Sequence, residues 1–355
     1  MKLNRADFID TLKQAEPALS SQDFLPILSH YCFDGEKVTA YNDMQAVQVR
    51  LETDFIGGLP GSVLTKMLSS YSNEFVEINS TVPTEVEMKS GKSKIKLPLL
   101  PNTMFLFHMP ELEGLPKFEL NSTFLDGLSK TLISVGTDPT HPSQMGISLY
   151  YGKEVVLYST DNLAVSKYTT KCTCKETGRV ILPTPFCQTL SSAMKSYKAD
   201  KMYMSIGAGF VVVQIGEKVS LFSKFVAEDE GHSLDFEAIL KQFTPKGEKV
   251  YMEIPTEFES ALERSLILLS KQIDKETSCS VKGKVVAMST ETPDGQGNDR
   301  VEFEGSFPED LDFRVDPTLI KRVLTVCSEI CFKGTAVLLK DERFFHLVSH
   351  YVKKS

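Results

Sequence analysis

The chain has 355 residues, of which 41% are hydrophobic and 24% charged, with a formal net charge of −8. This length exceeds one ordinary hydrophobic core and favours two or three domains, and the composition is that of a globular rather than a disordered protein. The negative charge argues against a protein that binds nucleic acid over its whole surface, so any basic surface has to be local.

The N-terminus and the cysteines predict a cytoplasmic protein. The opening residues MKLNRADFIDTLKQ contain no apolar run, so we expect no secretory signal. No stretch approaches the roughly 18 apolar residues of a membrane-spanning helix, so we expect no membrane association. The seven cysteines are scattered in apolar contexts, which is typical of thiols in a reducing compartment.

The first predicted unit has the order helix, three strands, helix, three strands. Its first helix covers 4–16, with Phe8, Ile9 and Leu12 on one side and Asn4 as a candidate N-cap. Its second helix covers 60–71 and starts at Pro60, a first-turn position where proline is tolerated. The predicted strands are 27–33, 37–41, 46–52, 75–80, 85–89 and 93–99.

The second unit repeats this order after a connector at 109–120. Its first helix, 121–135, has Phe124, Leu128 and Leu132 at helical spacing. Its second helix runs from Pro183 to about 198. The predicted strands are 145–150, 155–160, 164–170, 201–206, 209–215 and 219–225.

A third unit follows an acidic and polar connector at 227–249 that contains one apolar patch. The patch consists of Leu234, Phe236, Ile239 and Leu240. The predicted helices are 256–271 and 316–326, and the predicted strands are 279–282, 284–290, 300–304, 328–332, 335–340 and 344–348.

The order of these elements repeats three times, although sequence identity between the units is low. We therefore predict an α+β fold of three repeated domains, each with two helices packed on antiparallel sheets. The predicted domains cover 1–110, 120–226 and 249–355.

The second helix of each unit is net positive in a chain that is acidic overall. The helices carry Lys66 in the first unit, Lys195 and Lys198 in the second, and Lys321 and Arg322 in the third. For any single helix, lysines on a solvated face are the alternative interpretation. The same bias in all three units favours a shared basic surface.

Motifs for catalysis and metal binding are incomplete. Ser90-Gly91-Lys92-Ser93 lacks the earlier glycine of a phosphate loop, because that position is Val86. Cys172 and Cys174 have no second pair at zinc spacing, and His141 has no neighbouring Cys or Ser nucleophile. We therefore predict no catalytic residue, no metal and no cofactor.

Several segments, taken together and in order, resemble the bacterial-type replicative sliding clamp, the beta subunit of DNA polymerase III. They are LPILS at 25–29, YSTDNLAVSK at 158–167, RVILPTPFCQTL at 179–190, SKF at 223–225 and ALERSLILLS at 261–270. In the family signature Thr-Asp-Gly-His-Arg-Leu, Thr160 and Asp161 match, whereas Asn162-Leu163-Ala164 replaces Gly-His-Arg. The ending HLVSHYVKKS also differs from the family's Met-Pro-Met-Arg-Leu. The resemblance thus implies a divergent member, and cellular and viral origin both stay open.

The resemblance implies a non-enzymatic protein whose domains assemble into a ring. Two chains would join head to tail as a homodimer around double-stranded DNA, without sequence readout, and tether the replicative DNA polymerase. The other implied partners are the clamp loader and further proteins with clamp-binding motifs. The implied location is the cytoplasm, at the nucleoid, or the host cytoplasm for a viral clamp. The alternative is a non-enzymatic, three-domain, β-rich protein-binding scaffold without a DNA role.

The resemblance also implies three sets of site residues by position. The DNA-binding set is Arg5, Lys66, Lys195, Lys198, Lys321 and Arg322. The partner-peptide groove, between the second and third domains, is Thr160, Asn162, Leu163, Ala164, Val165, Leu234, Ile239, Leu240, Leu347, Ser349 and Tyr351. The dimer interface is Ile95, Leu97, Leu99, Leu268 and Leu269.

Overall fold

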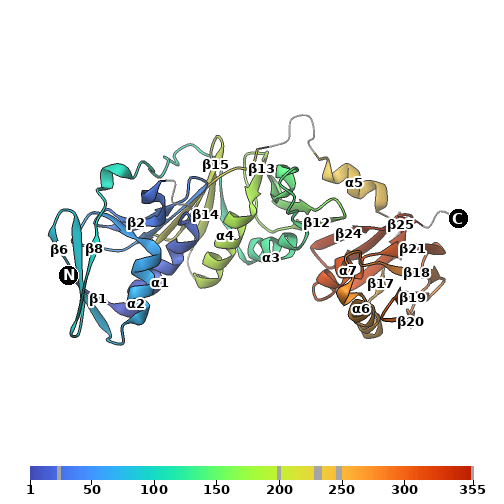
Figure 1. Ribbon diagram of the computed structural model, residues 1–355. Helices are drawn as coiled ribbons and strands as arrows, with labels where there is room; N and C mark the ends of the chain where they lie inside the picture. The colour runs from blue at the N-terminus through green and yellow to red at the C-terminus, as the bar shows by residue number, and fades with distance from the viewer. Residues whose placement is uncertain (22–24, 198–200, 228–233, 245–249, 353–355) are drawn as a thin grey trace. The chain divides into compact units, whose positions relative to one another are not determined.

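The structure, a computed structural model, describes residues 1–21, 25–197, 201–227, 234–244 and 250–352 (Figure 1). Its internal contacts divide the chain into two compact units. The first unit comprises 1–121, 174–176 and 185–225, and the second comprises 122–173, 177–184 and 226–355. The division into three domains stays a prediction.

The first unit contains an eight-stranded and a four-stranded sheet. The eight-stranded sheet, in spatial order, is β5 (Gly57–Pro60), β2 (His30–Phe33), β3 (Lys37–Tyr41), β4 (Gln45–Arg50), β16 (Val219–Lys224), β15 (Phe210–Ile215), β14 (Met202–Ile206) and β9 (Lys117–Leu120). The four-stranded sheet is β1 (Lys2–Asn4), β6 (Phe75–Val82), β7 (Glu85–Ser90) and β8 (Ser93–Pro98). The helices are α1 (Arg5–Ala15), α2 (Gly61–Ser70) and α4 (Thr184–Ser196), whose first residue is counted with the second unit.

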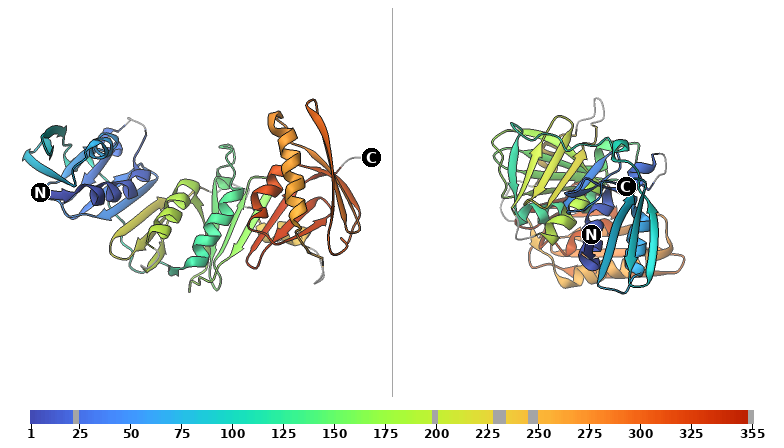
Figure 2. Two further views of the ribbon diagram at one scale, coloured as in Figure 1. Left: turned by 90° about the horizontal axis from the view of Figure 1, so that it is seen from below. Right: turned by 90° about the vertical axis from the view of Figure 1, so that its left-hand side faces the viewer.

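The second unit contains an eight-stranded and a five-stranded sheet (Figure 2). The eight-stranded sheet is β13 (Gly178–Pro183), β10 (Gly146–Tyr151), β11 (Val156–Thr160), β12 (Ala164–Thr169), β24 (Phe344–Ser349), β23 (Ala336–Lys340), β22 (Glu329–Lys333) and β17 (Met252–Glu253). The five-stranded sheet is β20 (Gly295–Glu302), β19 (Val285–Thr292), β18 (Thr277–Lys282), β21 (Leu311–Val315) and β25 (Tyr351–Val352). The helices are α3 (Ser122–Thr131), α5 (Phe236–Phe243), α6 (Thr256–Leu268) and α7 (Pro317–Leu324).

The element order reveals a repeat that is shorter than the predicted one. A short strand, a helix and a three-stranded meander recur six times, starting at β1, β5, β9, β13, β17 and β21. Each short strand pairs with the first strand of a meander, as β5 does with β2 and β13 with β10. These short strands, of two to six residues, were absent from the predicted element order, because each lies directly before a helix and strands such as Lys117–Leu120 fall within a predicted connector.

Two of these meanders join edge to edge in each eight-stranded sheet. β4 pairs antiparallel with β16 in the first unit, and β12 pairs antiparallel with β24 in the second. In both cases the last strand of one meander meets the last strand of another. We call each of these joints a seam. Continuous pairing across a seam covers strand edges that would otherwise be open to aggregation.

Local sequence explains where the helices begin. The Asn4 side chain accepts hydrogen bonds from the backbone N–H groups of Ala6 and Asp7 at 3.0 and 3.3 Å, so it is the N-cap of α1 as predicted. The Asp316 side chain accepts from the N–H of Thr318 at 2.8 Å and caps α7. The predicted helices at 4–16, 60–71, 121–135, 183–198, 256–271 and 316–326 are thus confirmed, with shorter bounds.

Three sequence expectations need correction. Residues 27–29 belong to a short 3₁₀ helix, Pro26–Ser29, because a proline opens it, and the strand starts only at His30. The strand expected at 300–304 is β20, Gly295–Glu302, since β19 and β20 form a longer hairpin. The connector at 227–249 contains α5, whose Phe236 and Leu240 are buried at helical spacing behind the N-cap Asp235.

Among the described residues, no helix has the length and apolar character needed to cross a membrane. All seven cysteines are buried thiols, as their apolar sequence contexts predicted.

Candidate functional site

Two of the predicted DNA-binding residues have exposed side chains. Lys66 lies on α2 and Lys195 on α4, and neither has a hydrogen-bond or ion-pair partner among the described residues. Their ammonium groups can therefore meet an external anion. Lys198 lies outside the described residues.

The other three predicted DNA-binding residues are engaged within the protein. Arg5 donates from Nε to the carbonyl of Asn73 at 2.9 Å and from Nη1 to that of Leu68, so it holds the end of α2. Lys321 pairs with Glu263 of α6, and Arg322 pairs with Asp161. Sequence spacing could not reveal these pairs, because they join elements that are far apart in the chain.

Lys13 is an exposed cation that was not among the predicted DNA-binding residues. It is exposed in the last turn of α1, where it lines a small cavity together with Ser192 and Ser196 of α4. The Tyr197 hydroxyl donates to the Gln14 amide oxygen between the same segments. Lys13 therefore lies beside the helix that carries Lys195, and its position in the last turn was the available signal.

Five of the predicted groove residues share one apolar cluster. Val165, Leu240 and Leu347 are buried in it, and Leu234 and Ile239 pack against it. The structure thus brings together residues from β12, β24 and the α5 segment. The burial of the first three also means that truncating them loosens the core as well as any groove.

α5 is anchored to this cluster by an aromatic stack and an ion pair. The Phe236 ring stacks on Tyr158 with centroids 4.9 Å apart. Glu237 pairs with Lys167 at 2.7 Å and accepts a hydrogen bond from the Tyr158 hydroxyl. Burial alone would raise the pKa of Glu237, but these two partners hold it below its usual value. The carboxylate is therefore charged at neutral pH and fixes the helix.

The remaining groove residues lie around the turn between β11 and β12 and at the end of β24. Leu163 has 43% of its surface exposed, whereas Thr160 and Ala164 are buried. The Ser349 N–H donates to the Leu163 carbonyl at 2.8 Å, which joins the end of β24 to the turn. The side chain of Tyr351 lies outside the described part of the structure.

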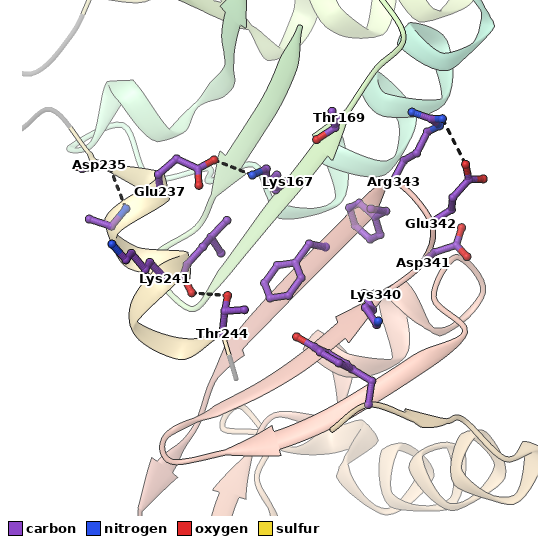
Figure 3. A pocket seen from close by; sticks show the side chains of 15 residues that line it. Lys167, Thr169, Asp235, Glu237, Lys241, Thr244, Lys340, Asp341, Glu342 and Arg343 are labelled. Carbon is purple, nitrogen blue, oxygen red and sulfur yellow. Dashed lines mark hydrogen bonds and ion pairs between the residues drawn. The ribbon is translucent and has the colours of Figure 1, made fainter. Parts of the chain in front are cut away.

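A pocket of about 900 Å³ opens beside α5 (Figure 3). Its wall includes Leu240 and Lys241 of α5, and its other side carries Lys340 and Phe345 from β23 and β24. The Lys340 ammonium lies 4.3 Å from the centre of the Tyr251 ring. Leu240 is the predicted groove residue that lines it. This pocket is at the start of β24, whereas Leu163 and Ser349 mark the opposite end of that strand.

A buried polar cluster lies beneath the seam of the second unit. His346 of β24 is fully buried, with Nδ1 2.9 Å from the Ser166 hydroxyl and 3.4 Å from that of Ser134. Burial lowers the pKa of His346 from 6.5 to about 3, with a further lowering from the charge of Arg322 and an opposing effect of the Leu319 carbonyl. The imidazole is therefore neutral in the folded protein at neutral pH.

This burial predicts a loss of stability in acid. Unfolded His346 takes up a proton near pH 6.5, and the folded protein cannot, so stability falls as the pH drops below that value. At pH 5 the contribution is a loss of about 2 kcal/mol. Urea unfolding of the wild type from pH 7 to 5 should show this extra loss relative to His346→Gln. His108→Gln, at an exposed position, should keep the wild-type slope, and equal slopes for all three proteins would refute the prediction.

The predicted dimer-interface residues divide into buried and accessible positions. Leu97, Leu99 and Leu269 are buried within the chain itself, whereas Ile95 and Leu268 are half-buried. A Cβ added at Gly297 of β20 would lie 2.9 Å from Leu268 Cδ1, so Leu268 packs on the backbone of this strand.

Two exposed isoleucines flank Leu268 in the chain. Ile267 is 71% and Ile273 98% exposed, and neither was a predicted interface residue. Apolar side chains this exposed, next to a strand edge, are typical of a surface that another protein covers. Ile267 lies in an apolar run, Leu266–Leu269, that is too long for one buried helix face, whereas no such run contains Ile273.

Comparison with known proteins establishes the fold along the whole chain. No model of a known protein family matches it, and no curated protein sequence does either. The DNA polymerase sliding clamp from Bacillus subtilis matches with a TM-score of 0.86 at 17% identity, over 99% of both chains. The chain has the sliding-clamp fold. The DNA polymerase III beta subunits from Pseudomonas aeruginosa (TM-score 0.85, 14% identity, 99% of both chains) and Thermotoga maritima (0.83, 18%, 100% of this chain and 99% of that one) agree. The predicted mixture of helices and antiparallel sheets is confirmed.

Proposed function

We propose that this protein is a DNA sliding clamp: it encircles duplex DNA and tethers the replicative polymerase, without catalysing a reaction. The observation that carries the proposal is the fold match over 99% of both chains, with a TM-score of 0.86. A clamp acts by topology and tethering, so it needs no nucleophile or metal. The weak sequence identity supports a divergent member of the sliding-clamp family, of cellular or viral origin.

The seams support assembly of two chains into a closed ring. β8 and β20 are the last strands of the two meanders that have not joined a seam, and in the described structure each has a neighbour on one side. Pairing β20 of one chain with β8 of a second copy would repeat the seam. The same contact made twice, head to tail, closes the homodimer.

The charged side chains of these two edges are paired within the chain. Lys94 and Lys96 of β8 pair with acids of β7, and Asp299 and Glu302 of β20 pair with Arg264 and Lys284. Pairing of the two edges would therefore rest on backbone hydrogen bonds and apolar contact more than on attraction between opposite charges.

Duplex DNA would be held through its phosphates. Lys66 and Lys195 are exposed on helices and have no partner among the described residues, and Lys13 lies beside the second of these helices. Few contacts suit a protein that has to slide, because each phosphate contact adds affinity without sequence information. The acidic remainder of the chain would keep DNA away from other surfaces.

Polymerase, clamp loader and other proteins with clamp-binding motifs would dock at the groove around Leu163, Val165, Ile239 and Leu347. The loss of the family's His and Arg at Leu163 and Ala164 supports a peptide preference of its own, with more apolar contact. The expected location is the cytoplasm, at the nucleoid, or the host cytoplasm for a viral clamp.

Reversing the charge of Lys66 and Lys195 tests the proposed DNA contact. Lys66→Glu with Lys195→Glu should weaken binding to duplex DNA at low salt, and should reduce the slope of log affinity against log salt by about 2, one per phosphate. Lys153→Glu, at an exposed position in the turn between β10 and β11, is the matched control and should change little. Equal slopes for the double variant and the wild type would show that these lysines do not contact phosphates.

A further inference from the structure

The turn between β11 and β12 is held in one conformation by its own side chains. Asn162 has φ +69°, in the left-handed region, which asparagine tolerates better than most residues. Asp161 Oδ1 accepts hydrogen bonds from the N–H groups of Leu163 at 3.1 Å and Ala164 at 2.7 Å. The turn thereby presents the partly exposed Leu163 at its tip.

The other oxygen of Asp161 ties this turn to a helix. Oδ2 accepts from Arg322 Nη1 of α7 at 3.0 Å, and the two side chains are 20% and 22% exposed. A charge-assisted hydrogen bond that is mostly shielded from water is strong, and loss of one partner leaves the other charge uncompensated. Asp161 therefore caps the turn with one oxygen and anchors it with the other.

Arg322 is poorly placed to bind DNA. Its Nη1 is committed to Asp161, and its Nε and Nη2 are buried, without a hydrogen-bond partner in the described structure. A phosphate contact needs N–H groups that a solvent-borne anion can reach. Lys321, the neighbouring cation, is likewise paired, with Glu263.

We propose that Arg322 is a positioning residue: through Asp161 it fixes the turn 161–163, and with it Leu163, and it does not contact DNA. The inference rests on the proposed function in taking this turn as part of the partner groove. Two hydrogen bonds between uncharged groups also hold the turn, from Gln144 Nε2 to Asn162 Oδ1 at 2.6 Å and from the Ser349 N–H to the Leu163 carbonyl. α7 thus sets the shape of a partner-binding element on a different part of the unit.

The closing experiment compares Arg322→Gln, Asp161→Asn and the double variant. Asp161→Asn keeps the Oδ1 acceptor of the turn and removes the charge that Arg322 meets, so it isolates the pair. Hydrogen exchange at the Leu163 and Ala164 amides should become about tenfold faster than in the wild type in each single variant. The double variant should exchange at the same rate as the single variants, because the pair is already broken in each of them. Amides of β18 should exchange as in the wild type, which separates a local effect from general destabilisation. Arg322→Lys, which retains the charge, should recover part of the protection.

Retention on nicked circular DNA and peptide binding provide the functional readouts. Both single variants should be retained like the wild type, while a fluorescent peptide from the C-terminus of the polymerase that uses this clamp should bind each about tenfold more weakly. The inference is overturned if Arg322→Gln alone shortens retention, as a phosphate contact requires, or if the Leu163 and Ala164 amides exchange normally in Asp161→Asn. A wild type that is not retained at all would refute the proposed function, and the exchange result would still decide the inference.

Discussion

Placing acids at Ile267 and Ile273 is expected to convert the protein into monomers. Pairing of β20 with β8 of a second copy would cover the end of α6, where Leu268 packs on β20 and these two isoleucines are exposed. A carboxylate forced into such a contact loses its hydration without gaining a partner. Ile267→Glu with Ile273→Glu should raise the dimer dissociation constant by about 100-fold or more, measured by sedimentation equilibrium.

Leu106→Glu is the matched control for this variant. Leu106 is 84% exposed but lies in the segment after β8 and outside both edge strands, so the same change there should leave the dimer intact. Exposed positions also avoid the ambiguity of Leu269, which is buried, so that its truncation would unfold the helix end together with any interface. A double variant that sediments as a dimer, like the wild type, would place the interface elsewhere.

Replacing Leu163 with Glu is expected to weaken partner docking strongly while the dimer stays intact. Leu163 stands, partly exposed, at the tip of a fixed turn, two residues before Val165 of the apolar cluster. Apolar anchors in such sites typically contribute about 2 kcal/mol or more, so the polymerase's C-terminal peptide should bind at least about 30-fold more weakly. Fluorescence anisotropy with the labelled peptide measures this directly.

Leu163 is a sharper probe than the buried groove residues. Leu240→Ala would remove a side chain from the core of the second unit and loosen α5, so a binding defect there has two explanations. Leu106→Glu again provides the control at an exposed leucine. Wild-type peptide affinity of a folded, dimeric Leu163→Glu protein would remove this turn from the docking site.

Amphipathic spacing made the helices of the repeat predictable. For example, Phe8, Ile9 and Leu12, following the N-cap Asn4, predict α1. The short strands before the helices were not predicted. Lys117–Leu120 does alternate polar and apolar residues, but four residues within a connector are weak evidence for a strand, and its pairing depends on its neighbour in the sheet. α5 was recognisable as an apolar patch, but its helical state depends on packing against β12 and β24.

For the predicted DNA-binding residues, the sequence did not reveal the environment of each side chain. Lys66 and Lys195 are exposed as expected, but Lys321 and Arg322 are paired with acids of other elements. Ion pairs between distant segments follow from tertiary structure, so charge counting along one helix cannot find them. The exposure of Ile267 could not be predicted from the sequence for the same reason, because it depends on the tertiary structure around α6.

Topological linkage to DNA is the most direct test of a closed ring. Protein diluted into monomers is concentrated again with nicked circular plasmid and passed through a gel-filtration column at high salt, which removes phosphate-only binding. The account predicts that protein elutes with the circle and is released when one restriction cut makes the plasmid linear. Protein that elutes identically with circular and linear DNA would contradict a clamp that encircles the duplex.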